Sequence, residues 1–577
     1  MLSSQLKSKI RQLWDAFWSG GIANPLTAIE QITYLVFLKR LEDLDIEREK
    51  TARNANRPYQ SIYDFPAISD SSGKVIRPAG ETFRWSYIKK LPTEERYEHV
   101  RKFVFDWLKE LEGAGQERMR DAVFLIPNAN LLTKAVDILD ELFVPERNQD
   151  TLGDIYEDLL QEIAVAGKNG QFRTPRHIIR AMCDLVDVKY GDRVVDPSCG
   201  TGGFLVNAYL HILQNNTSPD ILRFADDATP LHAVGDRLTA EEHAELRRNH
   251  LHGFDFDRTM VRLGWMNLIQ HGMENPQIHY ADSLGSKFNE RVAEGGDLYE
   301  HFDVVLANPP FTGNIDRNDI GRTLKPLGTT KTELLFVDLI LQLLKPGGRA
   351  AVIVPEGVLF GSSTAHQTLR RKLVEQTQLQ AVISLPGGVF QPYTGVKTSI
   401  LVFVKGGKTE DVWFYEVSAD GETLNAKRDP DPENNDLWDM RLKFKLRYQQ
   451  EPPAFIRPYE AERRAWQSLT EDERALQYLI PQFTEADETD EEGNPLPLRE
   501  INGFESQALV SSKNWIGTEK DLIANEHNLS AGRYKPFALD NTQHADPTEL
   551  IGELKALENK IQAGLDTLLM MVEGKDE

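Results

Sequence analysis

The sequence predicts a doubly wound α/β domain with a mostly parallel, seven-stranded sheet, preceded by a helical N-terminal domain and followed by a C-terminal helical tail. Two patterns lead to this prediction. From about residue 151, short apolar runs alternate with helical patterns, and strands that alternate with helices form parallel sheets covered on both faces. Before residue 150 and near the C-terminus, apolar residues recur at helical spacing instead. The length of 577 residues allows about three or four such units.

Residues 1–150 are expected to form a helical packing domain. Apolar side chains recur at helical spacing around Leu13 and over 32–41, and Pro25 stands where a helix can begin, since proline fits the first helical position. Two more helical segments are predicted over 94–112 and 131–142. The turn-forming residues of 55–82 predict a loop or a small irregular insertion.

Residues 151–425 are expected to form the α/β domain. Its strands are predicted at seven apolar runs: 193–195, 252–254, 278–280, 303–307, 350–354, 379–383 and 399–404. Helices are predicted between most of these runs, for example at 203–213, 258–271, 334–344 and 364–376. The last strand follows its predecessor after a turn-rich stretch, so it could run antiparallel.

Residues 426–577 are expected to be an irregular acidic region that ends in a helix. The run 485–492 is acidic and has no apolar face, which is typical of a solvated loop. Asp546, Pro547 and Glu549 then form a helix-start pattern. Seven residues follow at alternating steps of four and three: Leu550, Leu554, Leu557, Ile561, Gly564, Leu568 and Met571. Such a heptad stripe needs a partner helix, either in this chain or in another.

The charge of the chain bears on its partners. Lys+Arg number 66 and Asp+Glu 89, a net charge of −23, whereas nucleic-acid binders usually carry a basic excess. Residues 409–577 hold 18 basic and 36 acidic side chains, hence −18, and residues 1–408 hold the remaining −5. We therefore do not expect the chain to hold DNA alone. Because most of the negative charge lies in residues 409–577, residues 1–408 can still act on DNA.

The setting predicted from the sequence is a soluble, cytoplasmic one. Cys183 and Cys199 are the two cysteines, too few for a disulfide framework or a four-ligand zinc site. The first 18 residues carry scattered charges where a signal peptide would need an apolar core. The longest apolar stretch, 334–344, is too short to span a membrane and contains a charged residue.

The first candidate site is a glycine-rich turn between a strand and a helix. Asp196 ends the strand, and Gly200, Thr201, Gly202 and Gly203 lead into the helix. Ligands bind at the carboxyl ends of strands in such sheets, and glycines let the backbone approach them closely. A dinucleotide would need the spacing G-x-G-x-x-G, and the Asp196 carboxylate would repel its phosphates. The turn suits a cationic ligand better, such as the ammonium group of a methionine moiety.

Carboxylates also end the next two predicted strands. Asp255 stands where nucleotide-binding sheets hold ribose hydroxyls, because a carboxylate can accept two hydrogen bonds. Asp282 could accept a hydrogen bond from an adenine amino group. Each of them alone would fit an ordinary turn at a strand end. Three carboxylates at three successive strand ends favour a ligand site.

A second candidate site follows the next strand, in the run Asn308-Pro309-Pro310-Phe311. The prolines fix the turn and have no N–H donors, so only acceptors project from it. The Asn308 oxygen and a neighbouring carbonyl can both accept from one exocyclic –NH2 group, which aims the nitrogen lone pair at an electrophilic methyl. Phe311 offers a face for stacking an extruded base. The alternative is an ordinary turn that begins with asparagine and contains two prolines.

In this order, the motifs resemble those of the S-adenosylmethionine-dependent amino-methyltransferases that modify adenine N6 in DNA. More narrowly, the chain is similar to the modification subunits of type I restriction–modification systems, through 27–44, the α/β domain and 528–534. The resemblance covers most of the chain. Arg173 departs from it, since an aromatic or hydrophobic residue is more usual there, as do insertion-like stretches at about 215–249 and 450–510.

This resemblance implies a cofactor, S-adenosyl-L-methionine, no metal site, and methyl transfer to N6 of a flipped-out adenine. It implies cofactor binding by Gln171, Phe172, Arg173, Thr174, Pro175, Arg176, Asp196, Gly200, Thr201, Gly202, Gly203, Asp255 and Asp282. It implies catalysis and target-base binding by Asn308, Pro309, Pro310 and Phe311.

The resemblance also implies partners in a prokaryotic cytoplasm. These are double-stranded DNA, a DNA-specificity subunit that reads the sequence for two copies of this chain, and, where the system cleaves DNA, a separate restriction and translocase subunit. The heptad stripe would then pack against helices of the specificity subunit.

Other functions fit the sequence less well. A C5-cytosine methyltransferase needs a cysteine nucleophile, usually after a proline, and neither cysteine follows one. N4-cytosine enzymes usually have serine in place of Asn308, so that reaction stays open but disfavoured. Release-factor glutamine methyltransferases and some RNA methyltransferases share the double-proline turn, but would not need the helical domain and heptad tail. The intact motifs argue against a non-catalytic scaffold. The sequence also has no G-x-x-x-x-G-K-[ST] phosphate loop, which argues against a restriction nuclease or helicase in this chain.

Overall fold

The computed structural model describes residues 3–111, 119, 121–144, 149–166, 174–224, 230–273, 275–448, 468, 470, 513–535 and 562. The chain divides into two units, Met1–Tyr534 and Lys535–Glu577. The heptad stripe, the acidic run 485–492 and nearly all of the second insertion lie outside the described residues. None of the described helices is both long enough and apolar enough to cross a bilayer.

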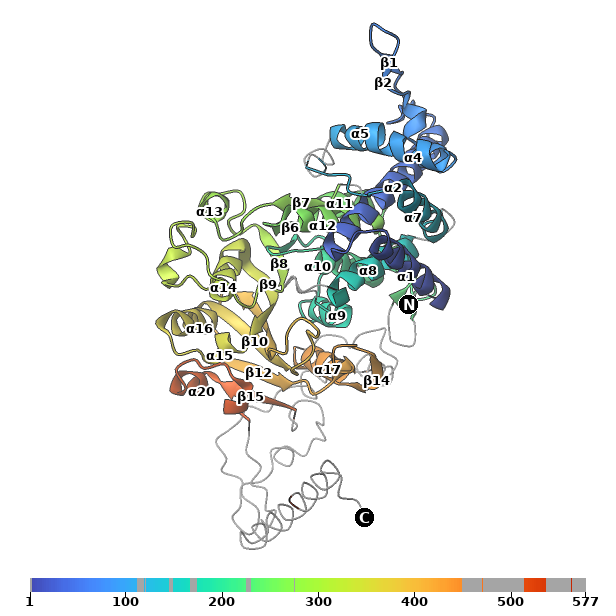
Figure 1. Cartoon of the computed structure of the whole chain (residues 1–577). Coiled ribbons are helices and arrows are strands. Elements are labelled where there is room, and N and C mark those ends of the chain that lie inside the picture. The colour runs from blue at the N-terminus through green and yellow to red at the C-terminus, as the bar shows by residue number, and fades with distance from the viewer. Residues whose placement is uncertain are drawn as a thin grey trace, which may run out of the picture. The chain divides into compact units, whose positions relative to one another are not determined.

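A nine-stranded sheet forms the centre of the first unit, in the order β15-β12-β10-β11-β9-β8-β3-β6-β7 (Figure 1). Its strands are β3 Val194–Asp196, β6 Leu251–Asp255, β7 Gln277–Tyr280, β8 Phe302–Ala307, β9 Leu344–Pro355, β10 Thr377–Leu385, β11 Thr398–Lys405, β12 Asp411–Glu416 and β15 Asn514–Thr518. Pairing is parallel from β9 through β8, β3 and β6 to β7, and between β10 and β12. β11 is antiparallel to both neighbours, and β15 is antiparallel to β12. The mostly parallel α/β fold and the antiparallel last predicted strand are confirmed.

The sheet has two strands more than the seven predicted. All seven predicted runs form strands, and β12 and β15 extend the sheet at one edge. β15 comes about a hundred residues after β12, so this pairing is not visible as a local pattern. Its Trp515 is 1 % exposed and donates a hydrogen bond from Nε1 to the carbonyl of Ala531 at 3.0 Å. The region after residue 408 therefore contributes to the core of the α/β domain.

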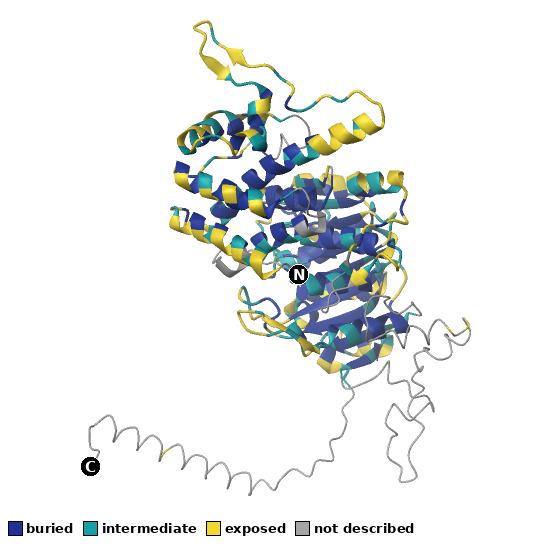
Figure 2. Cartoon of the chain, turned by 90° about the vertical axis from the view of Figure 1, so that its right-hand side faces the viewer, coloured by how far each residue is buried: buried dark blue, intermediate teal, exposed yellow. Residues whose placement is uncertain are grey.

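Helices cover both faces of the sheet, and successive strand residues contribute to different cores. Val194 packs with one core and Val195 with the other, because neighbouring side chains in a strand point to opposite faces. The first face is covered mainly by α9 Arg176–Leu185, α10 Gly203–Asn215, α12 Arg258–Gln270 and α17 Leu437–Arg447. The second face is covered mainly by α13 Ser286–Val292, α14 Thr332–Leu343 and α16 Thr364–Gln376. Figure 2 shows the strands between them as buried.

The N-terminal region is helical, as predicted, and has its own core. Its helices are α1 Ser4–Ser19, α2 Pro25–Asn54, η1 Gly80–Phe83, α3 Trp85–Ile88, α4 Thr93–His99, η2 Val100–Val104, α5 Phe105–Glu110, α7 Ala129–Leu142 and α8 Gln149–Ala166. α2 begins at Pro25 because Asn24 Oδ1 accepts hydrogen bonds from the N–H groups of Leu26 and Thr27. A hairpin of β1 Ile68–Ser69 and β2 Val75–Arg77 lies in the predicted insertion. α8 crosses the predicted boundary at residue 150 and packs in this helical core.

α12 is shared between the helical core and the sheet. Met260, Leu263 and Met266 on α12 pack with the N-terminal helices, while Val261 and Leu268 pack on the sheet. Arg262 is buried and forms an ion pair with Glu30 of α2 at 2.9 Å. The N-terminal helices therefore pack directly against α12, the helix that lies next to the glycine-rich turn.

The remaining short elements lie in connections. They are β4 Arg223–Phe224, β5 Pro230–Leu231, α11 Ala240–Asn249, η3 Lys325–Leu327, α15 Gly357–Phe360, β13 Asp420–Glu422, β14 Pro430–Asn435, α20 Glu519–Ala524 and η5 Ala531–Arg533. β4, β5 and α11 occupy the first predicted insertion.

Replacing the tryptophan of the late strand tests whether β15 belongs to the core. We expect Trp515→Ala to lower the free energy of unfolding by about 3–5 kcal/mol, since it removes a buried aromatic side chain and leaves a cavity. The matched control is Trp18→Ala, because Trp18 is 58 % exposed and should change that free energy by less than about 0.5 kcal/mol. Urea unfolding followed by circular dichroism measures both. Equal stability of the two variants would contradict the placement of β15.

Candidate functional site

Parallel pairing brings the predicted site residues to one edge of the sheet. β3 pairs with β6 on one side, with Asp196 opposite Gly253, and with β8 on the other, with Val195 opposite Val305. The carboxyl ends of β3, β6 and β8 therefore meet. Asp196 and Asp255 are the last residues of β3 and β6, and Asn308 directly follows β8.

The glycine-rich turn depends on missing side chains at three places. Gly200 and Gly202 have φ angles of +50° and +75°, in the left-handed region that favours glycine. α12 lies against the turn at Gly264, where a Cβ atom would come within 2.8 Å of the Gly200 carbonyl oxygen. Asn267, one turn further along α12, donates from Nδ2 to the Thr201 carbonyl at 3.0 Å. The turn is thus shaped by its own glycines and held by α12.

Two carboxyl groups that interact with one another lie beside the turn, Asp196 buried and Asp255 half-buried. Asp196 is 1 % exposed and accepts from the Ser198 N–H at 3.0 Å, while Asp255 accepts from the Gly200 N–H at 2.9 Å. Burial raises the pKa of Asp196 to about 8, and the neighbouring Asp255 carboxylate adds to this rise. Burial also raises the pKa of Asp255. No basic side chain of the described residues forms an ion pair with Asp196, so the site is suited to a cation brought by a ligand.

Asp282 stands at the border of this group. It follows β7 and is exposed, and its Oδ1 accepts from the Leu284 N–H at 3.1 Å. The adjacent Ser283 is buried and donates from Oγ to the Pro197 carbonyl at 2.6 Å, which ties the turn after β7 to the turn after β3. The three predicted carboxylates therefore lie at or just after the ends of three neighbouring strands.

The double-proline turn presents one buried acceptor without a partner. Asn308 Nδ2 donates to Thr174 Oγ1 at 2.9 Å, and Asn308 Oδ1 is buried with no hydrogen-bond partner among the described residues. Such an acceptor is costly unless something else satisfies it. Pro309 is buried and Pro310 half-buried. The amide oxygen is therefore left for a donor that the described residues do not supply.

The predicted stacking residue is buried in this state. Phe311 is 4 % exposed, and its ring meets that of Phe390 edge-to-face with 5.3 Å between centroids. Its face is therefore not presented to solvent, in contrast to the expectation for a base-stacking platform. A stacking role for Phe311 requires a change of this packing and stays a prediction.

The run 171–176, predicted to bind the cofactor, is described only from Thr174 onward. Gln171, Phe172 and Arg173 lie outside the described residues. Pro175 is the N-terminal cap residue of α9, and its carbonyl accepts from Ile178 and Ile179.

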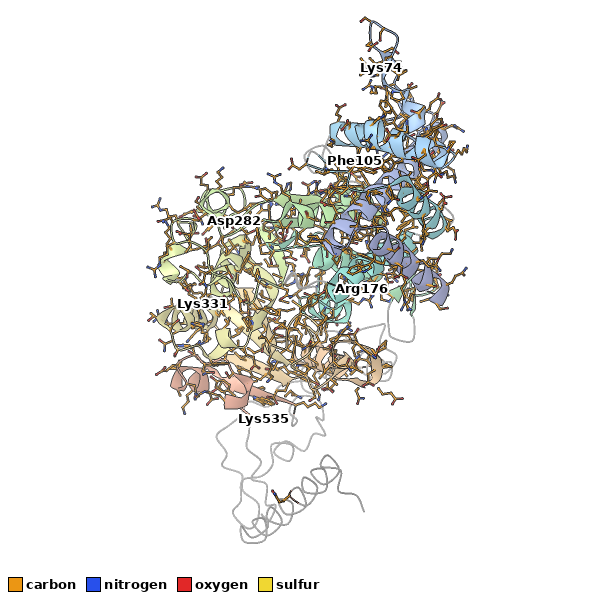
Figure 3. All side chains as sticks on the ribbon, viewed as in Figure 1. Lys74, Phe105, Arg176, Asp282, Lys331 and Lys535 are labelled. Carbon is orange, nitrogen blue, oxygen red and sulfur yellow. The ribbon has the colours of Figure 1, made fainter. Side chains whose placement is uncertain are left out.

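Arg176 is engaged by the protein itself. Its guanidinium forms ion pairs with Asp154 at 2.8 Å and with Glu157, both on α8 (Figure 3 labels Arg176). Asn267 Nδ2 also lies 3.4 Å from Glu157 Oε1. Arg176 thus anchors the start of α9, and its charge is compensated before any cofactor binds.

Sequence reasoning missed several residues that shape the site. They are Asp154, Glu157, Phe256, Gly264, Asn267, Ser283 and Phe390. Gly264 carried a usable signal, because an isolated glycine inside a helical pattern often marks close packing. Phe256, which follows Asp255, is 69 % exposed and offers an apolar surface beside that carboxylate.

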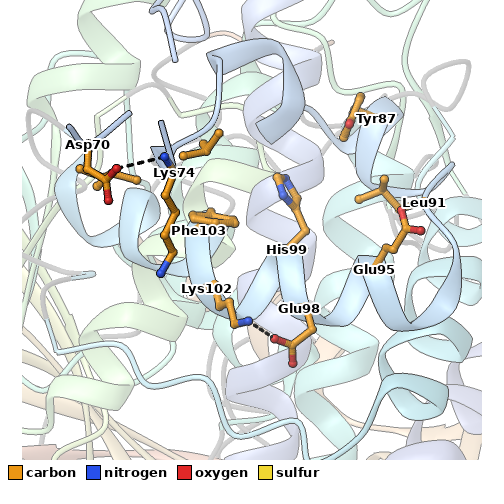
Figure 4. A pocket seen from close by; sticks show the side chains of 11 residues that line it. Asp70, Lys74, Tyr87, Leu91, Glu95, Glu98, His99, Lys102 and Phe103 are labelled. Atoms are coloured by element: carbon orange, nitrogen blue, oxygen red, sulfur yellow. Dashed lines mark hydrogen bonds and ion pairs between the residues drawn. The ribbon is translucent and has the colours of Figure 1, made fainter. Parts of the chain in front are cut away.

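A separate cavity of about 720 Å³ lies in the N-terminal helical region (Figure 4). Lys74, His99 and Phe103 are among the side chains that line it. None of its lining residues belongs to the predicted site, and acidic and basic groups are mixed in it. It therefore adds nothing to the chemistry at the edge of the sheet.

Comparisons with known proteins identify the family and relatives of this chain. The family model described as N-6 DNA Methylase matches residues 147–451, and the one described as HsdM N-terminal domain matches 6–139. The EcoEI methylase subunit of a type I restriction enzyme, from Escherichia coli, is 29 % identical over 418 residues, which cover 71 % of this chain and 77 % of that protein. The EcoKI methylase subunit, from Escherichia coli strain K12, is 27 % identical over 74 % of each chain.

Solved structures share the fold. A chain from work on the assembly and conformational transition of the type I R-M system has a TM-score of 0.63 and 24 % identity, covering 100 % of this chain and 99 % of that one. The methyltransferase subunit of a type I restriction–modification system from Streptococcus thermophilus has a TM-score of 0.58 and 17 % identity, covering 92 % and 99 %. The family model spans more than half of the chain, and it includes both candidate sites. The chain therefore belongs to the N-6 DNA methylase family, as a modification subunit of the type I restriction–modification kind.

Proposed function

We propose that this chain transfers a methyl group from S-adenosyl-L-methionine to N6 of an adenine flipped out of double-stranded DNA. The observation that carries the proposal is the buried Asn308 Oδ1, which has no partner among the described residues and lies at the same sheet edge as the glycine-rich turn. An unsatisfied acceptor at this place matches a ligand with an N–H donor. The exocyclic amine of adenine is such a donor.

The residues of the turn after β8 would make that amine nucleophilic. Asn308 Oδ1 accepts one of its hydrogens, and a backbone carbonyl of the double-proline turn accepts the other, since proline contributes no competing N–H. Holding both hydrogens turns the nitrogen lone pair away from the purine ring. S-adenosyl-L-methionine supplies, when bound, a methyl group attached to a positively charged sulfur. Asn308 Oδ1 and that carbonyl would hold the amine so that its nitrogen takes up the methyl group in exchange for one of its own protons, which would pass to water.

The first candidate site fits the cofactor. The buried Asp196 carboxyl has no cationic partner in the described structure, and it would pair with the methionine ammonium group. Asp255 would accept from the ribose hydroxyls with the lone pairs that its two backbone N–H contacts leave free. Asp282 would accept from the adenine amino group, and the exposed Phe256 would lie against the flat ring. Gly200, Thr201, Gly202 and Gly203 would let the ligand approach the backbone.

We further propose that the chain acts in a complex. Its relatives are methylase subunits of type I restriction enzymes, and the net charge of −23 is unsuited to holding DNA alone. A specificity subunit that binds two copies of this chain would supply the sequence readout and much of the grip on the duplex. The heptad stripe would pack on helices of that subunit. Restriction, where it occurs, would reside in another polypeptide.

Replacing the acceptor asparagine separates chemistry from cofactor binding. We expect Asn308→Ala to keep the dissociation constant for S-adenosyl-L-methionine within about threefold and to lower methyl transfer to DNA by at least about 10³-fold, because the amine loses its acceptor. Calorimetry and transfer of labelled methyl groups by the complex give the two values. Asn434→Ala, on the exposed part of β14, is the control and should leave both unchanged. Methyl transfer by Asn308→Ala at the wild-type rate would rule out this acceptor.

Replacing the buried carboxyl should affect cofactor binding and pH-dependent stability in opposite directions. Because the folded pKa of Asp196 is about 8 and the ordinary value 3.8, the folded chain holds a proton that the unfolded chain releases between these values. This contribution to stability is full below pH 3.8 and declines as pH rises toward 8. We expect the free energy of unfolding of ligand-free Asp196→Asn to lack this decline, and therefore to rise relative to that of wild type as the pH rises. Its affinity for S-adenosyl-L-methionine should be at least about tenfold lower.

Thermal unfolding from pH 5 to 8 and calorimetric titration measure the two effects of Asp196→Asn. The control is Asp106→Asn, because Asp106 is exposed on α5 and pairs with Lys109 there. Wild-type affinity for S-adenosyl-L-methionine in Asp196→Asn would show that this carboxyl does not hold the ammonium group.

Removing the heptad stripe tests the proposed partner. Ending the chain after Asn541 is expected to leave the unit Met1–Tyr534 folded and to weaken assembly with a specificity subunit. In the full chain, Leu557→Asp lies on the stripe and should weaken assembly in the same way, whereas Ala556→Asp lies beside it and should not. Co-purification with the specificity subunit and analytical ultracentrifugation report assembly. Unchanged assembly of the truncated chain would refute this role of the stripe.

A further inference from the structure

We propose that Thr174 is a positioning residue for methyl transfer, because its hydroxyl accepts from Asn308 Nδ2 and so holds the amide with Oδ1 toward the target amine. The proposal rests on the function proposed above and adds a residue from another part of the chain to the acceptor site. The two residues are 134 positions apart, and Asn308 Nδ2 lies 2.9 Å from Thr174 Oγ1. Thr174 is 6 % exposed, so water does not readily replace this contact.

The orientation of the amide matters because its two ends have opposite hydrogen-bonding character. Oδ1 accepts, whereas Nδ2 carries two hydrogens and only donates. An amide turned by 180° would present donors to the donor hydrogens of the adenine amine and could not align them. The Thr174 hydroxyl oxygen accepts from Nδ2, and this contact leaves Oδ1 on the side where it has no partner among the described residues.

The hydroxyl is held in place by the elements around it. Thr174 precedes Pro175, whose carbonyl accepts from the N–H groups of Ile178 and Ile179 at 3.1 Å. Arg176 follows, with its guanidinium on Asp154 and Glu157 of α8. Two anchors within two residues of Thr174 therefore fix its position relative to α8 and α9. The contact to Asn308 connects this assembly to the end of β8.

A merely local role does not explain the hydroxyl. Threonine before a helix commonly caps it, but the cap residue of α9 is Pro175, and no side chain forms a capping hydrogen bond there. The partner of the Thr174 hydroxyl is instead the asparagine to which the chemistry is assigned. A substitution that keeps the shape and removes the hydroxyl should therefore act on the rate of transfer.

The test compares three variants of the full chain in its complex with a specificity subunit. Thr174→Val removes the hydroxyl and keeps the volume, and Thr174→Ser keeps the hydroxyl. Thr133→Val on α7 is the matched control, because the Thr133 hydroxyl oxygen is also buried but has no hydrogen-bond partner in the described structure. Methyl transfer to adenine-containing DNA is measured at saturating S-adenosyl-L-methionine and DNA, and KM for each substrate is measured separately.

We expect Thr174→Val to lower kcat by at least about tenfold, with Thr174→Ser within about threefold of wild type and Thr133→Val unchanged. Wild-type kcat in Thr174→Val, with only KM for S-adenosyl-L-methionine raised, would overturn the proposal, since Thr174 would then serve the cofactor alone. Equal loss in the valine and serine variants would overturn it as well, because the hydroxyl would not be the cause.

Two further comparisons keep this test decisive. Should Thr174→Val not fold, Thr174→Ala against Thr174→Ser makes the same comparison between a residue with and one without a hydroxyl. If wild type itself transfers no methyl group to adenine, the proposed function fails. If wild type is active and Thr174→Val equals it, only the role of Thr174 fails.

Discussion

Parallel pairing of β3 with β6 on one side and with β8 on the other determines where the site residues lie. It brings the ends of three strands together, and with them Asp196, Asp255 and Asn308. Hydrogen bonds then join neighbouring turns, from Gly200 after β3 to Asp255 at the end of β6, and from Ser283 after β7 to Pro197 after β3. A shift of one strand by one residue would move its terminal side chain to the other face and separate the groups.

At the same edge of the sheet lie polar groups that the described residues do not compensate. Asp196 is buried without an ion-pair partner in the described structure, and Asn308 Oδ1 is buried without a hydrogen-bond partner there. By contrast, the Arg176 guanidinium nearby is compensated by Asp154 and Glu157. A folded chain tolerates uncompensated buried groups only at some cost in stability, which makes them indicators of ligand binding. The Asp196 carboxyl suits a cation, such as the ammonium group of the proposed methyl donor. Asn308 Oδ1 suits a hydrogen-bond donor, such as the proposed purine amine.

The sequence predicted the parts of this site that are local and missed those that are not. Seven strands, the glycine-rich turn and the run from Asn308 to Phe311 each appear as a continuous pattern. β15 pairs with a strand about a hundred residues away, and Thr174 meets Asn308 across 134 positions, so no local pattern contains either contact. In the sequence, Gly264 is only a glycine within a helical pattern. A glycine is needed there because the Gly200 carbonyl lies against it, and this contact is visible only in the structure. The burial of Phe311 against Phe390 likewise depends on packing between distant segments.

The position of the transferred methyl group distinguishes methylation of adenine N6 from the alternative reactions. DNA would be incubated with S-adenosyl-L-methionine that carries a labelled methyl group and with the complex of this chain and a specificity subunit, then digested to nucleosides and separated by chromatography with mass detection. We expect the label in N6-methyldeoxyadenosine. Label in N4-methyldeoxycytidine, or in protein or RNA but not in DNA, would contradict it.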